Sequence, residues 1–459
     1  MDTLPIRVPT SDSVRSSPPR YRIACAFAPK KVRSFLTPSL IAACFSKGIE
    51  IVPVDPSRSL LEYRSSSEEN ELATDVPQKP PFDAVVHKVL TAEWADQLRI
   101  LAEQFPTFAG RIVDPTERIA RVCNRASMLQ GLLPDADTCQ ATEISKLAGE
   151  EKAAVGVEVT GGWRNGEGEE EGRKWEIVPG FFVCVPQQMV LTLSELRRLA
   201  GDPQEGPSGS SYLQDVLQSQ GLSCPLVAKP VEANGSTASH SLSLVFNTDG
   251  LMALAHSLEA VPTTTSPASA VDAADVAPDA DTMGACIPAV ASVSAQKHAD
   301  CKEPSIVLQQ FINHGSRLTK LYVVGSSARC EVRPSLPDVA PSQCQPDVSP
   351  GYLPFSHVSN VPVPQPTHLP NAGSSTDSSM NMGTDDLWPG PLPDGVADAL
   401  GKHLREQLGL RLFNVDIVRS VACPNRFFII DVNYFPGFAK LHGYEELLSD
   451  FFLSLLQNK

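Results

Sequence analysis

Dense apolar segments alternate along this chain with long stretches that lack hydrophobic periodicity, and this alternation limits how it can fold. Glycine, glutamate, serine, proline and alanine dominate these stretches, which cover much of 135–175, 201–220, 262–303 and 337–393. Such a composition buries too little apolar surface to offset the entropy of ordering the chain. We therefore expect flexible insertions there, with a core built from the apolar segments between them.

The N-terminal part alternates strand-like and helix-like segments, which favours an α/β unit of parallel strands covered by helices. The predicted strands are "YRIACAF", "IEIVPVD" and "FDAVVHKVL", and the predicted helices are "SFLTPSLIAACFSKG" and "AEWADQLRILAEQF". Another helix is predicted over 116–133, with Asp114 and Thr116 as candidate caps.

Composition excludes several classes of protein. The chain has 459 residues, enough for two or three domains, and a net charge of −15, which would repel nucleic acid and anionic membranes. Its 11 cysteines are scattered without a C-x-x-C pair, as expected for reduced thiols inside a cell. No apolar run approaches the roughly 18 residues of a membrane helix. We expect a soluble monomer in the cytoplasm, with the nucleus as the alternative.

Two strands near the C-terminus, "RLFNVDIVR" and "NRFFIIDVNYF", are joined by a short turn and are predicted to form a hairpin. Symmetry about the turn places Asp416 opposite Asp431 and Asn414 opposite Asn433. Strict alternation puts these four residues on one face. The other face is then expected to carry Phe428, Ile430, Val432 and Tyr434.

Two carboxylates directly across a ladder repel each other, so a cation or a shared proton must compensate them. Ligands that are all oxygen atoms favour magnesium over zinc or copper. A solvated polar sheet face is an equally open interpretation of this pattern.

The segment "PLVAKPVEANGSTASHSLSLVF" combines a strand ending near Lys229 with a loop at 235–237 and then His240. The backbone N–H groups of such a loop can bind phosphate oxygens. A plain hairpin loop is the alternative, because the chain contains no G-x-x-x-x-G-K-[ST] motif.

Cationic and polar side chains recur in the apolar segments in larger number than ATP alone requires. A second, highly anionic ligand would explain the excess. These residues include Lys30, Lys31, Lys88, Arg125, His314, Arg317, Lys320 and Arg333.

Several motifs in order give the chain a family resemblance: "HKVL", "VCNRASM", "AKPVEANGSTASHSLSLVF", "QQFINHGSRLTKLYVVG", "VRPSLPD", "LFNVDIV" and "IIDVNYFPGF". From Tyr21 to the C-terminus, the chain resembles the inositol-tetrakisphosphate 1-kinases, also called inositol 1,3,4-trisphosphate 5/6-kinases. The resemblance implies an ATP-grasp fold with an N-terminal Rossmann-like α/β domain. The expected parts are a disordered leader at 1–20, the α/β domain at 21–112, a central ATP-grasp subdomain at 113–310 and a C-terminal one at 311–459.

The resemblance also implies roles for individual residues. ATP is expected to contact Arg125, Lys229, Gln309, Lys320, Ser335 and Ser359, with Gln309 in the linker that borders the adenine. The inositol phosphate is expected to contact Lys31, Lys88, His240, Lys320, Asn433, Gly437 and Lys440. Magnesium is expected on Asp416, Asp431 and Asn433, and the catalytic cations are His240 and Lys320.

The implied activity is transfer of the γ-phosphoryl group of ATP, with magnesium as cofactor, to a hydroxyl of an inositol polyphosphate. Implied acceptors are inositol 1,3,4-trisphosphate at the 5 or 6 position and inositol 3,4,5,6-tetrakisphosphate at the 1 position. Plant-like relatives add pyrophosphate formation on inositol hexakisphosphate. Asn234 departs from the family pattern, which leaves the preferred isomer open. The alternatives are an ATP-grasp carboxylate-amine ligase and a non-catalytic inositol phosphate-binding scaffold.

Overall fold

The computed structural model describes the chain in stretches. They are 19–63, 79–133, 174–200, 208–233, 238–258, 304–345, 349, 351–355, 389–393, 395–439 and 441–457. Most of the expected leader and insertions lie outside these residues. The chain divides into two compact units, one of 1–113 with 438–459 and one of 114–437. The four parts expected from the sequence stay a prediction.

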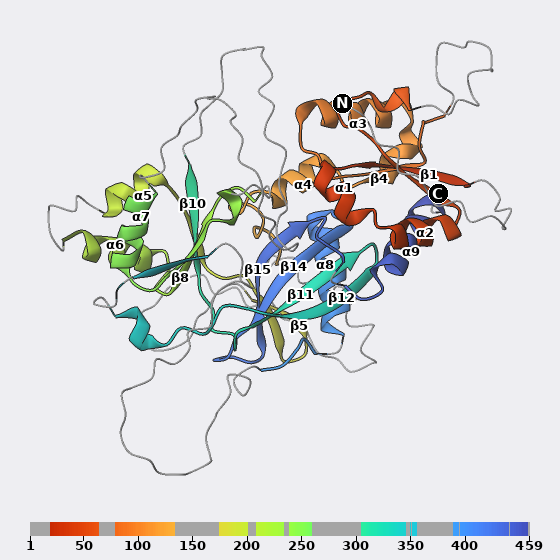
Figure 1. The fold of residues 1–459 in the computed structure, drawn as a ribbon. Coiled ribbons are helices and arrows are strands. Elements are labelled where there is room, and N and C mark those ends of the chain that lie inside the picture. Colours follow the sequence, from red (N-terminus) through yellow and green to blue (C-terminus); the bar gives the residue numbers. More distant parts are fainter. Residues whose placement is uncertain are drawn as a thin grey trace, which may run out of the picture. The chain divides into compact units, whose positions relative to one another are not determined.

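A four-stranded sheet forms the centre of the first unit (Figure 1). Its order is β2-β1-β3-β4, and all neighbouring strands are parallel, which confirms the prediction. All four residues of β3 are buried, as expected where helices cover both faces of a parallel sheet. The strands are β1 (Tyr21–Ala26), β2 (Ile49–Pro53), β3 (Ala84–His87) and β4 (Ile112–Val113).

Among the described residues, four α-helices belong to the same unit. The C-terminal helix α9 joins it through side-chain contacts: Thr37 Oγ1 lies 2.9 Å from the Tyr444 hydroxyl, and Lys47 Nζ donates to Glu446 Oε1 at 2.9 Å. The helices are α1 (Pro29–Phe35), α2 (Pro38–Ser46), α3 (Ala92–Gln104) and α9 (Tyr444–Gln457).

One helix predicted over 34–48 is in fact two. Thr37 caps α2 by accepting a hydrogen bond from Leu40 N at 3.3 Å, and Pro38 occupies the first helical turn. A residue before proline avoids the helical conformation, so α1 ends before Thr37. The prediction missed this break because the apolar pattern continues through it.

A five-stranded antiparallel sheet forms part of the second unit, in the order β13-β9-β8-β10-β7. Its strands are β7 (Gln188–Thr192), β8 (Leu226–Pro230), β9 (Leu242–Val245), β10 (Ser305–Gln310) and β13 (Tyr352–Phe355). Figure 1 shows α5 (Leu193–Ala200), α6 (Ser208–Ser219) and α7 (Thr248–Ser257) gathered beside it. Leucines of the three helices share one buried cluster with Leu226 and Leu308.

The expectation of flexible insertions was wrong for two short regions. Helix α6 lies within 201–220, where Leu213 and Leu217, one turn apart, are buried. Strand β13 lies within 337–393 and pairs with β9. Two leucines in a serine-rich stretch give little periodicity, so the packing of α6 against its neighbours stabilises the helix.

A six-stranded sheet forms the rest of the second unit, in the order β12-β11-β14-β15-β6-β5. The predicted hairpin is confirmed as β14 and β15, which are antiparallel. Helix α8 (Val396–Leu408) packs on this sheet through Gly401, where an added Cβ would come within 2.8 Å of Ala328 Cβ. The strands are β5 (Lys174–Val178), β6 (Phe181–Cys184), β11 (Arg317–Val324), β12 (Ser327–Pro334), β14 (Leu412–Arg419) and β15 (Arg426–Tyr434).

The helix predicted over 116–133 ends much earlier. Helix α4 spans Thr116–Val122, and neither candidate cap is used, since Pro115 is the N-cap. The buried Asp114 carboxylate instead accepts from Arg411 N at 2.8 Å, Arg411 Nε at 2.9 Å and Leu412 N at 3.2 Å. It therefore fastens the start of β14.

Within the described residues, no helix has the length and apolar character needed to cross a bilayer.

Candidate active site

A row of charged side chains crosses the middle of the six-stranded sheet. Lys320 on β11 pairs with Asp416 on β14, and Asp416 pairs with Asp431 on β15. Asn414 likewise pairs with Asn433. Residues directly opposite each other in an antiparallel ladder share a face. The predicted pairing of the four oxygen-bearing residues is confirmed, and Lys320 lies on the same face.

A bulge interrupts the hairpin beside the acidic pair. Asp416 pairs with Asp431, but Ile417 pairs with Ile429, which leaves Ile430 without a cross-strand partner on β14. A bulge inserts one extra residue and changes the side to which the following residues point. The backbone of Ile430 is thereby released from this ladder.

The bulge corrects one prediction about the faces of the hairpin. Phe428 pairs with Val418, which lies two residues from Asp416 and hence on its face. Phe428 and Ile430 pack in one apolar cluster with Leu318 and Val418. The expectation that Phe428 and Ile430 lie on the opposite face was wrong, because it assumed strict alternation along β15.

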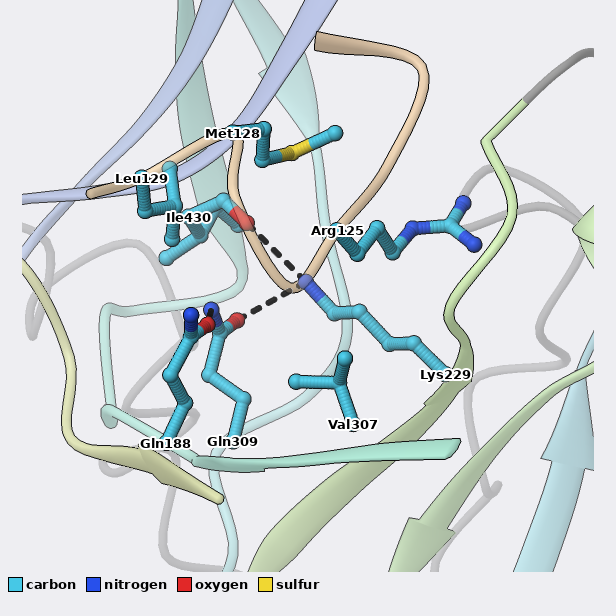
Figure 2. Close-up of a pocket in the computed structure, with 8 residues that line it drawn as sticks. All are labelled: Arg125, Met128, Leu129, Gln188, Lys229, Val307, Gln309 and Ile430. Atoms are coloured by element: carbon cyan, nitrogen blue, oxygen red, sulfur yellow. Dashed lines mark hydrogen bonds between the residues drawn. The ribbon is translucent and has the colours of Figure 1, made fainter. Parts of the chain in front are cut away.

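Lys229 on β8 is buried, and its hydrogen-bond partners among the described residues are neutral acceptors (Figure 2). Its Nζ donates to Gln309 Oε1 at 2.8 Å and to the released Ile430 carbonyl at 3.0 Å. Burial lowers the pKa of Lys229 to about 8, since the charge of Asp431 offsets only part of the desolvation. This ammonium is thus poorly neutralised.

A small pocket surrounds Lys229. Figure 2 shows its mixture of apolar and polar walls, in which Gln309 Nε2 also approaches Gln188 Oε1 at 3.4 Å. An apolar pocket with a few converging polar groups is typical of small-molecule sites, but the empty volume of about 160 Å³ is smaller than such sites usually have. The lining residues are Arg125, Met128, Leu129, Gln188, Lys229, Val307, Gln309 and Ile430.

Lys320 is bonded to a charged partner. Its Nζ donates to Asp416 Oδ1 at 2.6 Å and to Asp416 Oδ2 at 2.9 Å. Burial lowers the pKa of Lys320, but the charge and hydrogen bonds of Asp416 outweigh it, so the pKa is raised. Lys320 therefore stays protonated across the physiological pH range.

Asp431 and Asn433 provide oxygen atoms suited to a hard cation. Asn433 Nδ2 donates to Asp431 Oδ2 at 3.0 Å. Asp431 Oδ1 is buried and has no hydrogen-bond partner among the described residues. Together with Asp416, these residues offer two carboxylates and an amide, the donor types that magnesium takes. In the part of the chain that the structure describes, no cluster of three His, Cys, Asp or Glu residues could hold a metal.

Arg125 fastens backbone around the loop that follows β8. Its Nη1 donates to Pro230 O at 2.8 Å and Glu232 O at 3.2 Å, and its Nη2 donates to Ser239 O at 3.1 Å. Its Nε lies 3.9 Å from Asp431 Oδ1. The guanidinium thus connects both ends of 230–239 to the acidic face.

Ser335 forms a pair with the buried His314. Ile312 O lies 2.6 Å from His314 Nδ1, so this nitrogen carries the proton, and Nε2 accepts from Ser335 Oγ at 2.6 Å. Burial lowers the pKa of His314, which favours this neutral form. The Ser335 hydroxyl is held with its lone pairs directed away from the ring.

The other expected site residues have varied positions. Gln309 lies inside β10, so it is part of a strand. His240 ends a short 3₁₀ turn at Ala238–His240 and is half-buried, while Gly437 is exposed. Ser359 and Lys440 lie outside the described residues.

Lys31 and Lys88 belong to the unit that contains the parallel sheet. Burial and, as the smaller cause, the charge of Lys88 lower the pKa of Lys31 to about 7. An anionic ligand would offset the repulsion between these two cations.

Comparison with known proteins identifies the family. The model of the inositol 1,3,4-trisphosphate 5/6-kinase ATP-grasp domain matches residues 182–259 and 289–454, and the model of the pre-ATP-grasp domain of the same kinase matches residues 22–65. This chain belongs to the inositol 1,3,4-trisphosphate 5/6-kinase family. The predicted family, its α/β ATP-grasp fold and its kinase class are thereby confirmed.

Plant members of the kinase family match nearly the whole chain. Inositol-tetrakisphosphate 1-kinase 5 of Oryza sativa subsp. japonica is 30% identical over 95% of this chain and 90% of its own length. Inositol-tetrakisphosphate 1-kinase 2 of Glycine max is 30% identical over 96% of both chains.

Solved structures resemble the chain more distantly. D-cycloserine synthetase DcsG has a TM-score of 0.44 at 12% identity, over 95% of this chain and 100% of that one. A RimK domain ATP-grasp protein of Sphaerobacter thermophilus has a TM-score of 0.40 at 15% identity, over 94% and 99%. A likeness of this degree is too low to bear on function.

In this kinase, sequence reasoning did not assign a role to several residues of the site: Gln188, the backbone of Ile430, and the pairing of His314 with Ser335. The polar pair in "CVPQQMVLT" was the available signal for Gln188. The released carbonyl of Ile430 depends on the bulge. The pairing of His314 with Ser335 depends on a loop that packs against the end of a strand.

Proposed function

We propose that this chain is an ATP- and magnesium-dependent kinase of inositol polyphosphates. Its acceptors would be inositol 1,3,4-trisphosphate, at the 5 or 6 position, and inositol 3,4,5,6-tetrakisphosphate, at the 1 position. The observation that carries the proposal is the cross-strand row of Lys320, Asp416 and Asp431, with the buried Lys229 close to its end. The row combines oxygen ligands for a cation with cations for phosphates.

In this proposal the nucleotide enters the pocket around Lys229. Met128, Leu129, Val307 and Ile430 offer apolar surface to a base. Lys229 would give up two neutral acceptors for an anionic phosphate, an exchange that favours binding because charge-assisted hydrogen bonds are stronger. Gln309 and Lys320 would contact the same nucleotide, as would Arg125, Ser335 and Ser359.

Asp416, Asp431 and Asn433 would hold magnesium. When bound, the ion supplies neutralisation of the charge on the ATP phosphates. Asp431 Oδ1 supports this role because it is a buried acceptor that makes no hydrogen bond among the described residues, with Arg125 Nε 3.9 Å away.

The acceptor phosphates would be held by several cations. We assign them to Lys31, Lys88, His240, Lys320 and Lys440, with Asn433 and Gly437 at the reacting end. A polycationic pocket is the expected complement of a ligand that carries three or more phosphates.

Phosphoryl transfer passes through a loose transition state, so positioning and charge neutralisation provide most of the catalysis. Lys320 and His240 would stabilise charge on the transferred group. We assign no dedicated general base to the acceptor hydroxyl. A carboxylate-amine ligase is disfavoured because a small carboxylate needs only one or two cations.

We further propose that the kinase acts as a monomer in the cytoplasm or nucleus and binds neither nucleic acid nor membranes. Its net charge of −15 supports the last two points, since both partners are anionic.

The test is incubation of the purified chain with ATP, magnesium and separate inositol phosphates, with products resolved by isomer. We expect products from the trisphosphate and the tetrakisphosphate. Inositol hexakisphosphate forms a third arm, where a new pyrophosphate would extend the activity. A protein that binds the ligands without consuming ATP would be a scaffold, and no turnover in any arm would contradict the proposal.

A further inference from the structure

Asn414 lies on the polar face of the sheet but takes no part in the contacts described above. It pairs with Tyr322 on one side and with Asn433 on the other. It is two residues from Asp416 on β14 and therefore shares the face of the acidic pair. Its side chain is 3% exposed.

Among the described residues, the Asn414 amide oxygen lacks a hydrogen-bond partner. Oδ1 is buried and accepts no hydrogen bond among the described residues. Roughly nine in ten buried polar atoms of native proteins do find a partner, so an exception calls for an explanation such as an ion or water.

A second oxygen on the same face also accepts no hydrogen bond. Asp431 Oδ1 is buried, and among the described residues its ion-pair partner Arg125 Nε, at 3.9 Å, is too distant for a hydrogen bond. Both oxygens can only accept, so a donor at hydrogen-bond distance or a cation would satisfy them. Asn414 pairs with Asn433 and Asp431 pairs with Asp416, so they belong to successive residue pairs on this face, separated by one pair that faces the other way.

We propose that Asn414 is a positioning residue of the cation site, where its Oδ1 accepts a hydrogen bond from a water on the divalent cation. This rests on the proposed cation site but not on the choice of phosphoryl acceptor. Magnesium usually keeps several waters because it sheds them reluctantly. Groups that bond the ligands of a metal commonly contribute tenfold to a hundredfold to its affinity.

The test uses Asn414→Leu, which has a similar shape and no oxygen. In the absence of metal and nucleotide, we expect a higher urea midpoint of unfolding, because an unsatisfied buried acceptor is removed. Mn²⁺ binding, followed by electron paramagnetic resonance with a non-hydrolysable ATP analogue, should weaken by about tenfold or more. A residue with a merely structural role would give a lower midpoint and unchanged Mn²⁺ affinity.

Asn247→Leu is the matched control. Asn247 is equally buried but fully bonded, since Oδ1 accepts from Gly250 N at 2.8 Å and Nδ2 donates to Gln345 O at 2.7 Å. This variant should have a lower midpoint and the Mn²⁺ affinity of the parent protein.

Asn414→Asp keeps an oxygen at the position and decides the question if the leucine variant does not fold. It should lower the midpoint without metal, through repulsion with Asp416, and retain Mn²⁺ affinity. Two outcomes would overturn the inference. One is Mn²⁺ affinity in Asn414→Asp that falls as far as is predicted for Asn414→Leu. The other is Mn²⁺ affinity in Asn414→Leu that equals that of the parent protein. Neither the urea midpoint nor the Mn²⁺ affinity requires turnover. Absence of inositol phosphate kinase activity in the parent protein would therefore contradict the proposed function and leave this inference standing.

Discussion

Two lysines of the second unit show how differently one residue type can be prepared for an anionic ligand. Lys229 on β8 is bonded to an amide and a carbonyl, whereas Lys320 on β11 is bonded to both oxygens of Asp416. The pKa of Lys229 is lowered to about 8, and that of Lys320 is raised. Both are substantially buried, so the partner decides the direction of the shift.

The difference indicates that the two lysines have different roles in the proposed reaction. Lys229 holds a charge that Asp431 compensates only in part and that a phosphate would satisfy, so its proposed contribution is to nucleotide binding. Lys320 is already compensated and fixed beside Asp416, so it contributes preorganised charge. The two lysines should therefore respond differently to substitution and pH.

The largest effect is expected from Asp431→Asn, because Asp431 acts on both lysines. Its charge raises the pKa of Lys229 and of Lys320, and its carboxylate is a proposed cation ligand. We expect kcat to fall more than about 100-fold with the fold retained, as when a preorganised charge is removed. Steady-state kinetics and circular dichroism would measure this. Near-parental kcat would remove Asp431 from the cation site, and the exposed Glu62→Gln serves as the control.

Stability should separate the two lysines. Lys320→Met leaves Asp416 buried and unpaired, which should lower the free energy of unfolding by about 3 kcal/mol. Lys229→Met removes a buried charge whose partners are neutral, so the lost hydrogen bonds and the relieved desolvation should leave a change of about 1 kcal/mol or less. Urea denaturation of both variants compares the two values. Equal losses of unfolding free energy in the two variants would mean that the charge of the hydrogen-bond partner does not affect stability.

The pH dependence of nucleotide binding should follow Lys229 alone. A lysine whose pKa is lowered to about 8 loses its proton as pH rises through 8, and the neutral amine attracts phosphate poorly. Affinity for a non-hydrolysable ATP analogue should therefore fall about tenfold between pH 7 and pH 9. Calorimetry would measure it. Lys229→Arg, which stays charged, should flatten the profile, while an unchanged slope in this variant would assign the dependence to another group.

The smallest effect is expected from making Lys229 resemble Lys320. Gln309→Glu gives Lys229 a carboxylate in place of its amide partner, which should raise the pKa of Lys229. We expect nucleotide affinity at pH 7 to fall by about threefold, since the ammonium is now compensated, and the midpoint of its pH profile to move upward. Gln188→Glu is the matched control, because Gln188 is hydrogen-bonded to Gln309 and not to Lys229. Tighter nucleotide binding by Gln309→Glu would contradict the roles proposed for the two lysines.

Local pattern was sufficient for much of the fold. The three predicted strands of the first unit and its helix at 92–105 are present, because their apolar periodicity is long and uninterrupted. Prediction failed where a short element depends on distant partners. Helix α6 is ordered by the shared leucine cluster, and Asp114 bonds to the start of β14 rather than capping α4.

For the site, the sequence placed Asp416 opposite Asp431 because hairpin pairing follows from symmetry about a turn. It could not reveal the bulge at Ile430, since one extra residue leaves no mark in a run of apolar residues. The bulge moved Phe428 and Ile430 to the polar face and gave Lys229 a carbonyl partner.

The sequence by itself thus determined the family, the strand and helix pattern of the first unit and the pairing of the acidic residues across the hairpin. Each of these follows from order and spacing along the chain. Only the tertiary structure decided which lysine faces a carboxylate and which faces neutral acceptors, and that the buried Asn414 oxygen accepts no hydrogen bond from the described residues. Burial and hydrogen bonding depend on segments brought together from distant parts of the sequence, and they fix the charge state of each group.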